Sequence, residues 1–262
     1  MTIYENIRLE RKGKVATLKI NRPPLNLLDT PLLQEIIEVL QSIKEDKECR
    51  ILVLTGESDK VFIGGADMNE MKNLNPRTAK EFITLLHSVM KSLRLLPIPV
   101  IGKINGYALG GGCEVAMACD LRIASESTIL GLPEVKVGIP SVIEASLMPR
   151  LIGFGWATDL LLTGRNIDAK EAYRLGLVHQ VVKNKKLDQT VEDLVQKLIL
   201  CAPQALKAQK ELIYGWMNRF LDESIKMGIE AFSKSYEGPE PKEGMNSFFK
   251  KKPPSWALDE TK

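Results

Sequence analysis

The stretch NGYALGGGCEVAMACD, residues 105–120, joins three consecutive glycines to an apolar run that is interrupted by Glu114. The pattern predicts a strand that ends before the glycines and a helix over residues 111–119. The first N–H groups of a helix have no partner inside it, and together with the helix dipole they favour negative charge. Glycine allows a ligand to approach such amides closely. Glu114 lies three residues after Gly111 and therefore on the same helical face, so an anion at the Gly111 amide would lie within its reach.

A tight strand–helix turn with an incidental glutamate is the plainer interpretation of this stretch, because a glycine triplet alone is a weak signal. A dinucleotide-binding fingerprint does not fit, since GxGxxG counted from Gly110 requires a glycine at the position of Val115. No Walker motif occurs either. The choice between a structural turn and a ligand site therefore depends on the rest of the chain.

A second glycine turn favours the ligand site. In FIGGADM, residues 62–68, a predicted strand runs through two glycines to the amides of Ala66 and Asp67 at the start of a helix. Two such turns can supply two N–H donors to one oxygen atom, which is the arrangement of an oxyanion hole.

A second acid supports the same interpretation. Glu134 in GLPEVKVGIP follows Glu114 by twenty residues, and a strand between them can return the chain and bring the two carboxyl groups together. Two carboxyl groups beside an oxyanion hole suit acid–base chemistry next to a carbonyl.

Strand and helix patterns alternate along the chain, which predicts an α/β fold with a helical C-terminal section. YENIRLE and KVATLKI predict a β-hairpin, and RILVLTG predicts a buried strand. Further strands are expected in KVFI, PVIGKING, DLRIAS, TILGLPE and GLVHQVV. Helices are expected over residues 30–47, 78–95 and 111–119, twice within 143–163, and from 187 to the end with breaks at Pro203 and at 238–244.

The composition is that of an ordinary soluble globular protein. The 262 residues are 44% hydrophobic and 26% charged, and the net charge of +3 argues against nucleic acid as the main partner. No apolar run is long enough for a membrane span, and the N-terminus has no apolar signal core, so we expect a cytoplasmic protein with no membrane partner. The four cysteines lack CxxC spacing and are expected to be reduced and mostly buried, and two histidines argue against a His-based metal site.

Six segments in a fixed order resemble the enoyl-CoA hydratase/isomerase family, the crotonase superfamily. They span almost the whole chain, and their combination is far more specific than any one of them. The segments are NRPPLNLLD, FIGGADMNEM, PVIGKINGYALGGGCEVAMACDLRIAS, LGLPEVKVGIP, LLTGRNIDAKEAYRLGLV and EGMNSFFKK.

The resemblance implies a fold and an assembly. The expected fold is a crotonase-type spiral of ββα repeats over residues 1–200 that holds the active site. The expected C-terminal region, residues 201–262, is helical, forms a trimer and contributes to the site for coenzyme A. A trimer or a dimer of trimers, hence a hexamer, is the expected homo-oligomer.

The resemblance also implies roles for the residues that match the family's motifs. The two oxyanion amides fall on Ala66 and Gly111, and the two acids fall on Glu114 and Glu134. Members that carry out other reactions commonly lack one acid, so both acids together resemble a hydratase that adds water to the 2,3 double bond of an enoyl-CoA, as in fatty acid metabolism. Glu114 would deprotonate water, and Glu134 would protonate the α-carbon. Neither a metal nor a cofactor is expected, since coenzyme A is part of the substrate.

The expected substrate site is wider than these four residues. It includes the flanking positions and the C-terminal end, where Phe248 can pack near the adenine of coenzyme A and the basic segment 250–252 either reaches its nucleotide end or is a solvated tail. The residues expected to contact the acyl-CoA are Gly64, Gly65, Asp67, Met68, Gly110, Ser141, Glu144, Phe248 and Lys251.

One segment departs from the family. After GIP the family's hydratases usually continue with a glycine-rich stretch, but this chain has SVIEASLMPRLIG. Ser141 stands where a glycine amide often contacts the water. Val142 and Ile143 either reshape the acyl pocket or point into the core. Glu144 is either an exposed acid at a helix start or a pocket residue, because a carboxylate is costly to bury without a partner.

The sequence is also compatible with functions other than hydration. Within the same family, isomerisation or another CoA-thioester lyase or hydrolase reaction remains open. A serine hydrolase requires a Ser–His–Asp set, but no GxSxG elbow is present, and His87 and His179 are interpreted as structural. RNA binding through basic helices on the same fold would produce strongly salt-dependent binding.

Overall fold

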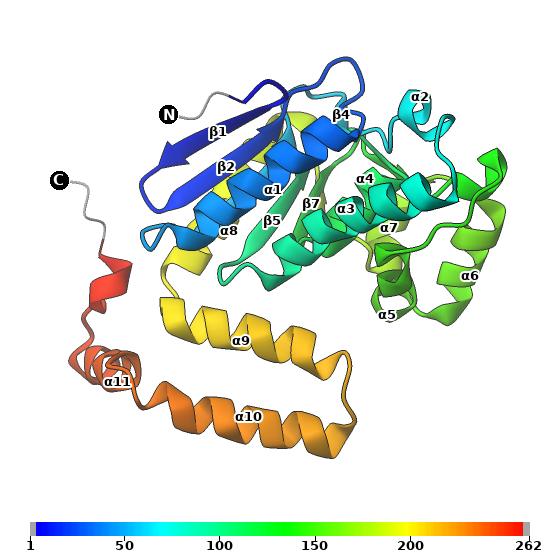
Figure 1. Cartoon of the computed structure of the whole chain (residues 1–262). Coiled ribbons are helices and arrows are strands. Elements are labelled where there is room, and N and C mark those ends of the chain that lie inside the picture. The colour runs from blue at the N-terminus through cyan, green and yellow to red at the C-terminus, as the bar shows by residue number, and fades with distance from the viewer. Residues whose placement is uncertain (1–3, 259–262) are drawn as a thin grey trace. The chain divides into compact units, whose positions relative to one another are not determined.

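Strands of two sheets alternate along the chain in the computed structural model, which describes residues 4–258 (Figure 1). The larger sheet has the strand order β1-β2-β3-β5-β7-β10. β1 and β2 form the predicted antiparallel hairpin, and all other neighbours in this sheet are parallel. Its strands are β1 (Ile7–Lys12), β2 (Val15–Ile20), β3 (Ile51–Gly56), β5 (Val100–Ile104), β7 (Leu121–Ser125) and β10 (Gln180–Val182).

The smaller sheet has the order β4-β6-β8-β9, and β4, β6 and β8 are parallel. Its strands are β4 (Val61–Ile63), β6 (Tyr107–Leu109), β8 (Ile129–Gly131) and β9 (Ile167–Asp168). The chain thus places one strand in the larger sheet, the next in the smaller sheet, and then forms helix. This ββα unit recurs as β3–β4–α3, β5–β6–α4 and β7–β8–η1, which is the spiral that the resemblance implies.

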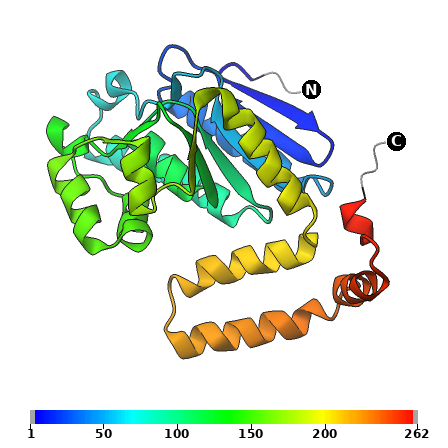
Figure 2. The same ribbon diagram turned by 180° about the vertical axis from the view of Figure 1, so that it is seen from behind.

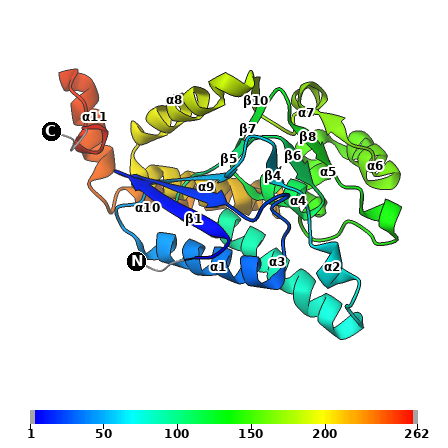
Figure 3. The same cartoon turned by 90° about the horizontal axis from the view of Figure 1, so that it is seen from above.

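Helices cover the larger sheet and connect the strands. α1 (Thr30–Glu45) and α3 (Pro76–Leu95) lie side by side along one face of that sheet (Figure 3). Both begin with a proline in the first turn and with a side-chain cap, from Asp29 and Asn75. The other helical elements before residue 187 are α2 (Met68–Met71), α4 (Gly111–Ala118), η1 (Glu134–Val137), η2 (Glu144–Leu147), α5 (Met148–Ile152), α6 (Phe154–Thr163), α7 (Ala169–Leu175) and η3 (Asn184–Lys186).

The contacts divide the chain into two units. The first comprises the residues up to Leu96 and Val100–Val191, and the second comprises Pro97–Pro99 and the residues from Glu192 onward. The division falls inside α8 (Leu187–Ile199), whereas the domain boundary expected at residue 200 stays a prediction. The second unit contains α9 (Pro203–Trp216), α10 (Leu221–Ser235), α11 (Glu240–Lys250) and η4 (Ser255–Ala257). In Figure 2, α9 and α10 run antiparallel beside each other.

Most predicted elements are present, but β6, β9, α7, η1 and η3 were not predicted. β6 and β9 have three and two residues, too few for a periodic pattern. The C-terminal helical region also breaks at 217–220, between α9 and α10, where no break was predicted. None of the four cysteines, all of which lie in the described residues, forms a disulfide, and three of them are buried as predicted, whereas Cys201 is exposed. Among the described residues no helix has both the length and the apolarity needed to cross a bilayer.

Candidate active site

The first glycine turn connects β4 to α2 and is held by the backbone of Leu28. Gly65 has a φ of +119°, which L side chains rarely adopt, and its carbonyl accepts a hydrogen bond from the Leu28 N–H at 2.8 Å. The Asp67 N–H donates to the Leu28 carbonyl, also at 2.8 Å. Within residues 4–258 the Ala66 N–H, between these two bonds, has no protein acceptor.

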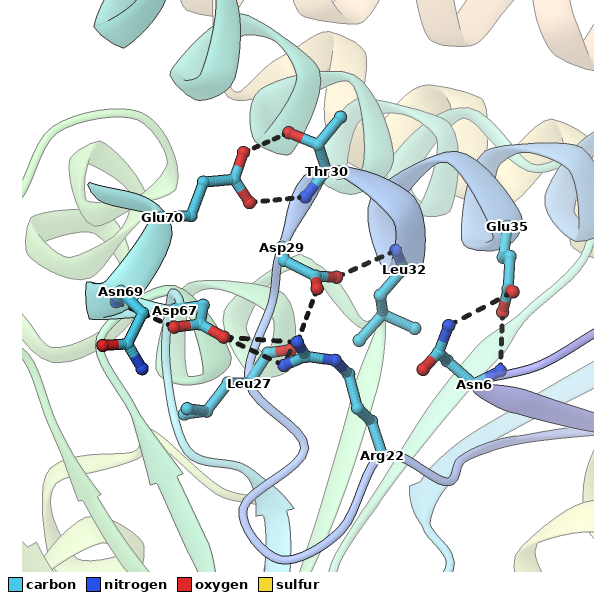
Figure 4. A network of polar contacts seen from close by, with 10 residues as sticks. All are labelled: Asn6, Arg22, Leu27, Asp29, Thr30, Leu32, Glu35, Asp67, Asn69 and Glu70. Atoms are coloured by element: carbon cyan, nitrogen blue, oxygen red, sulfur yellow. Dashed lines mark hydrogen bonds and ion pairs between the residues drawn. The ribbon is translucent and has the colours of Figure 1, made fainter. Parts of the chain in front are cut away.

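Polar side chains fix this turn to the start of α1 (Figure 4). Arg22 contacts Asp67 at 3.2 Å and Asp29 at 2.5 Å, and Glu70 accepts a hydrogen bond from the Thr30 N–H at 2.9 Å. Asp67 also caps α2, and the Asn69 N–H, followed by Arg22, lowers the pKa of Asp67. Both carboxylate oxygens of Asp67 thus have protein partners. Its expected contact with substrate stays a prediction, and its observed role is to hold the turn.

The second glycine turn connects β6 to α4, and at Gly110 and Gly112 a Cβ would force a neighbouring group to move. Gly110 has a φ of +53°, and a Cβ there would lie 2.9 Å from Oε1 of Glu134 and 3.9 Å from the Cα of Gly65. A Cβ at Gly112 would lie 2.1 Å from the carbonyl oxygen of Ile63, a clash. These close approaches are the physical reason for the glycines, and they bring the two turns and Glu134 together.

The Gly111 N–H remains available at this turn. The Gly110 N–H donates to the Gly131 carbonyl at 2.9 Å, whereas Gly111 is the first residue of α4, and its N–H has no protein acceptor in the described part of the chain. Two amides without partners, Ala66 and Gly111, therefore belong to adjacent turns, as an oxyanion hole requires.

Glu114 is buried in the first turn of α4, with 3% of its surface exposed. Its Oε1 accepts a hydrogen bond from the Ala145 N–H at 2.6 Å. Burial, together with the charges of Glu134 and Glu144, raises the pKa of Glu114 to about 8 against this hydrogen bond. The group therefore exchanges a proton near neutral pH, which suits acid–base catalysis.

Glu134 occupies the first position of η1, directly after β8 and Pro133. It is half-buried, and its Oε2 accepts a hydrogen bond from Ser141 Oγ at 2.7 Å. The β7 and β8 strands return the chain between the two acids, as the sequence predicts. Ser141 thus contacts an acid, and its contact with water stays a prediction.

Glu144 is not the exposed acid that was one of the two expectations. Only 2% of its surface is exposed, and its carboxylate lies 2.6 Å from Arg94 Nη2 and 3.2 Å from His87 Nδ1. The Glu144 carboxylate can be buried because α3 supplies these two basic partners. A direct contact with substrate stays a prediction for Glu144. Val142 is 44% exposed and Ile143 is half-buried, so Val142 does not point into the core.

Arg94 is the site residue that the sequence interpretation missed. His87 was interpreted as a packing histidine, and its observed contact is a hydrogen bond between its Nδ1 and the Glu144 carboxylate. Arg94 lies seven residues after His87 in a predicted helix, and this spacing places both on one helical face. The sequence signal that could have identified this cluster is the acid Glu144 in a mostly apolar segment together with two basic residues on one face of a single helix.

The remaining expected substrate residues are distributed over both units. Gly64 is half-buried beside Leu25 in the first turn, and Met68 is exposed at the start of α2. Phe248 is exposed on α11 and Lys251 follows that helix, so both belong to the second unit. Within residues 4–258 no group of three or more His, Cys, Asp or Glu side chains is placed to hold a metal ion.

The buried acid predicts a pH-dependent effect on stability. The pKa of Glu114 is raised from 4.5 to about 8, so between these pH values the folded protein holds a proton that the unfolded chain releases. The free energy of unfolding therefore falls as the pH rises through this window, by about 1.4 kcal/mol for each unit of pKa shift. We expect Glu114→Gln to raise the melting temperature at pH 8.5 and to change it much less at pH 5.

Thermal unfolding followed by circular dichroism measures this difference. Glu134→Gln is the matched control, because Glu134 is only half-buried and should give a smaller gain at pH 8.5. A melting temperature of Glu114→Gln at or below that of the wild type at pH 8.5 would contradict the prediction.

Comparisons with known proteins agree with this geometry. The sequence profile described as enoyl-CoA hydratase/isomerase matches residues 10–259. A protein named short-chain-enoyl-CoA hydratase, from Clostridium acetobutylicum, is 41% identical over 249 residues, which cover 94% of this chain and 95% of that protein. A protein named crotonyl-CoA hydratase, from Syntrophomonas wolfei, is 38% identical over 251 residues, which cover 95% of this chain and 96% of that protein.

Solved structures are similar over the same extent. The crystal structure of an enoyl-CoA hydratase from Bacillus anthracis superposes with a TM-score of 0.93 at 34% identity, covering 97% of this chain and 100% of that one. The two-sheet spiral, the paired glycine turns and both acids are thus found in a chain that matches the family over nearly its whole length. This protein belongs to the enoyl-CoA hydratase/isomerase family.

Proposed function

We propose that this protein is an enoyl-CoA hydratase, which adds water across the 2,3 double bond of an enoyl-CoA thioester to form a 3-hydroxyacyl-CoA. The observation that carries the proposal is the convergence of two unpartnered amides and two carboxyl groups on the paired glycine turns. The names of the relatives, short-chain-enoyl-CoA hydratase and crotonyl-CoA hydratase, support a short acyl chain.

In the proposed mechanism the thioester oxygen accepts hydrogen bonds from the Ala66 and Gly111 amides. Ionised Glu114 removes a proton from water as the water oxygen bonds to the β-carbon, and the negative charge moves to the thioester oxygen. Protonated Glu134 then delivers a proton to the α-carbon. The proton taken by Glu114 returns through solvent to Glu134, which restores both acids. A base whose pKa is near the working pH suits the first step.

The presence of both acids supports hydration over isomerisation, since an isomerase moves a proton within the substrate and consumes no water. We propose that no cofactor takes part, because the thioester acidifies the α-position and the amides stabilise the oxyanion. Phe248 and Lys251 are proposed to contact the nucleotide end of coenzyme A. Four cysteines without a disulfide, three of them buried, support a reducing compartment such as the cytoplasm.

We propose a trimer or a dimer of trimers for the assembly. On α10 the side chains of Ile225, Ile229 and Phe232 follow helical spacing and are 51%, 62% and 67% exposed. Such a stripe of large apolar residues on one face supports a contact with another subunit.

The first prediction tests the acids. Glu114→Gln and Glu134→Gln should each lower kcat for crotonyl-CoA by about 100-fold or more, because positioned proton transfer contributes at least that much. Loss of absorbance of the conjugated thioester measures the rate. Glu81→Gln, a change at an exposed acid on α3, is the control and should retain the wild-type rate. Near-normal turnover in either folded active-site variant would remove that acid from the mechanism.

The second prediction tests the Gly111 amide. Gly111→Pro removes the N–H, whereas Gly111→Ala keeps it and adds a Cβ that meets Leu86 at 3.3 Å and Leu28 at 3.4 Å. The added bulk is thus shared by both variants at the Cβ. We expect Gly111→Pro to be slower than Gly111→Ala by about 10²–10³-fold, the cost of one oxyanion donor. Equal rates in two folded variants would show that this amide does not stabilise the transition state.

The third prediction concerns assembly. Light scattering should give three or six times the chain mass of 29.2 kDa. Ile229→Glu should shift the protein toward smaller species, because it places a charge in the apolar stripe of α10. Lys91→Glu, at an exposed position on α3, should leave the mass unchanged. An active wild-type monomer at micromolar concentration would refute the proposed assembly.

A further inference from the structure

One short segment, residues 141–145, contacts both acids of the candidate site. At its start Ser141 Oγ donates to Oε2 of Glu134 at 2.7 Å, and at its end the Ala145 N–H donates to Oε1 of Glu114 at 2.6 Å. The two acids belong to different elements, η1 and α4. The position of this segment therefore affects the orientation of both carboxyl groups at once.

The segment has little support of its own. Residues 139–143 form no helix or strand, and Val142 among them is 44% exposed. Ser146 adds only a local hydrogen bond, from its Oγ to the Ile143 carbonyl at 2.8 Å. The long-range side-chain contact of the segment, beyond those to the two acids, is that of Glu144 with Arg94 and His87. These two residues lie on α3, a helix of twenty residues that packs against both α1 and α4.

The contact between Glu144 and α3 is a buried, charge-assisted hydrogen bond. The Arg94 Nη2 lies 2.6 Å from Oε1 of Glu144, which is a charge-assisted hydrogen bond in a site where the carboxylate is 2% exposed. His87 Nδ1 lies 3.2 Å from the same carboxylate. Burial of an ionised carboxylate is costly without such partners, so the carboxylate has a strong preference for this one position.

We propose that Glu144, anchored by Arg94 and His87, is a positioning residue for the reaction: it fixes the 141–145 segment so that the Ala145 N–H holds the Glu114 carboxylate in the orientation that activates water. The inference rests on the proposed hydratase function. It assigns a role to the residues that replace the glycine-rich stretch usual in the family's hydratases.

The expected effect follows from geometry. The Ala145 N–H directly follows Glu144 in the chain, so loss of the Glu144 anchor allows this donor to move away from Glu114. Displacement of a catalytic group by about 1 Å can lower a rate by about 10²-fold. The proposal gives Glu144 a positioning role in place of the expected direct contact with the acyl-CoA, since its carboxylate is 2% exposed and is bound by Arg94 and His87. Substrate binding should therefore change little.

Three variants test the proposal in the full-length protein with crotonyl-CoA. We expect Glu144→Ala to lower kcat by about 10–100-fold while KM stays within about threefold. Glu144→Gln keeps an acceptor for Arg94 and should recover part of that loss. Glu171→Gln is the matched control, because Glu171 also lies between two cations, Arg165 and Arg174, but contacts neither acid of the site. It should retain the wild-type kcat.

A double-mutant cycle separates positioning from a general structural effect. If Glu144 acts through Glu114, then Glu144→Ala should slow the Glu114→Gln enzyme by less than about twofold, measured at raised enzyme concentration. A full 10–100-fold further loss in that background would overturn the proposal, as would wild-type kcat in Glu144→Ala. If Glu144→Ala does not fold, the same cycle with Glu144→Gln decides. Absence of crotonyl-CoA hydration by the wild type would instead contradict the proposed function.

Discussion

Two turns meet at Gly65 and Gly110, and the candidate site depends on this contact. A Cβ on Gly110 would be in ordinary contact with the Cα of Gly65 at 3.9 Å but would lie only 2.9 Å from Oε1 of Glu134, so any other residue there would displace the Glu134 carboxyl group. Positive φ angles at both glycines turn the chain sharply into α2 and α4. The amides that follow them, Ala66 and Gly111, consequently lack protein partners.

The smaller sheet explains why these groups are adjacent at all. β4, β6 and β8 are parallel neighbours, so their carboxyl ends lie along one edge. Ala66 follows β4, Gly111 follows β6 and Glu134 follows β8. Ligands of parallel α/β sheets commonly bind outside the carboxyl ends of the strands, and this sheet of very short strands obeys the same rule.

The sequence predicts those parts of the structure that depend on local signals. The hairpin, the buried strand β3 and the capped helices α1 and α3 have clear periodicity and caps, and the two glycine turns are visible as motifs. β6 was missed because three residues between glycines show no periodicity, although its place between β4 and β8 orders the whole site. The partners of Glu144 were missed for another reason. Arg94 and His87 lie 50 and 57 residues away in the chain, and only tertiary packing brings them to the acid.

Two buried glutamates in the same site have opposite surroundings, and the difference matches different tasks. Glu144 forms an ion pair with Arg94 at 2.6 Å. Among the ion pairs of residues 4–258 none includes Glu114, whose acceptor bond comes from the neutral Ala145 amide and whose pKa burial raises. A cation on Glu114 would lower its basicity and weaken it as a proton acceptor. Arg94 on α3 pairs with Glu144, the residue before Ala145, and so holds the 141–145 segment in place. Glu114, the proposed base, accepts a hydrogen bond from the Ala145 amide of that segment and stays without a cation partner.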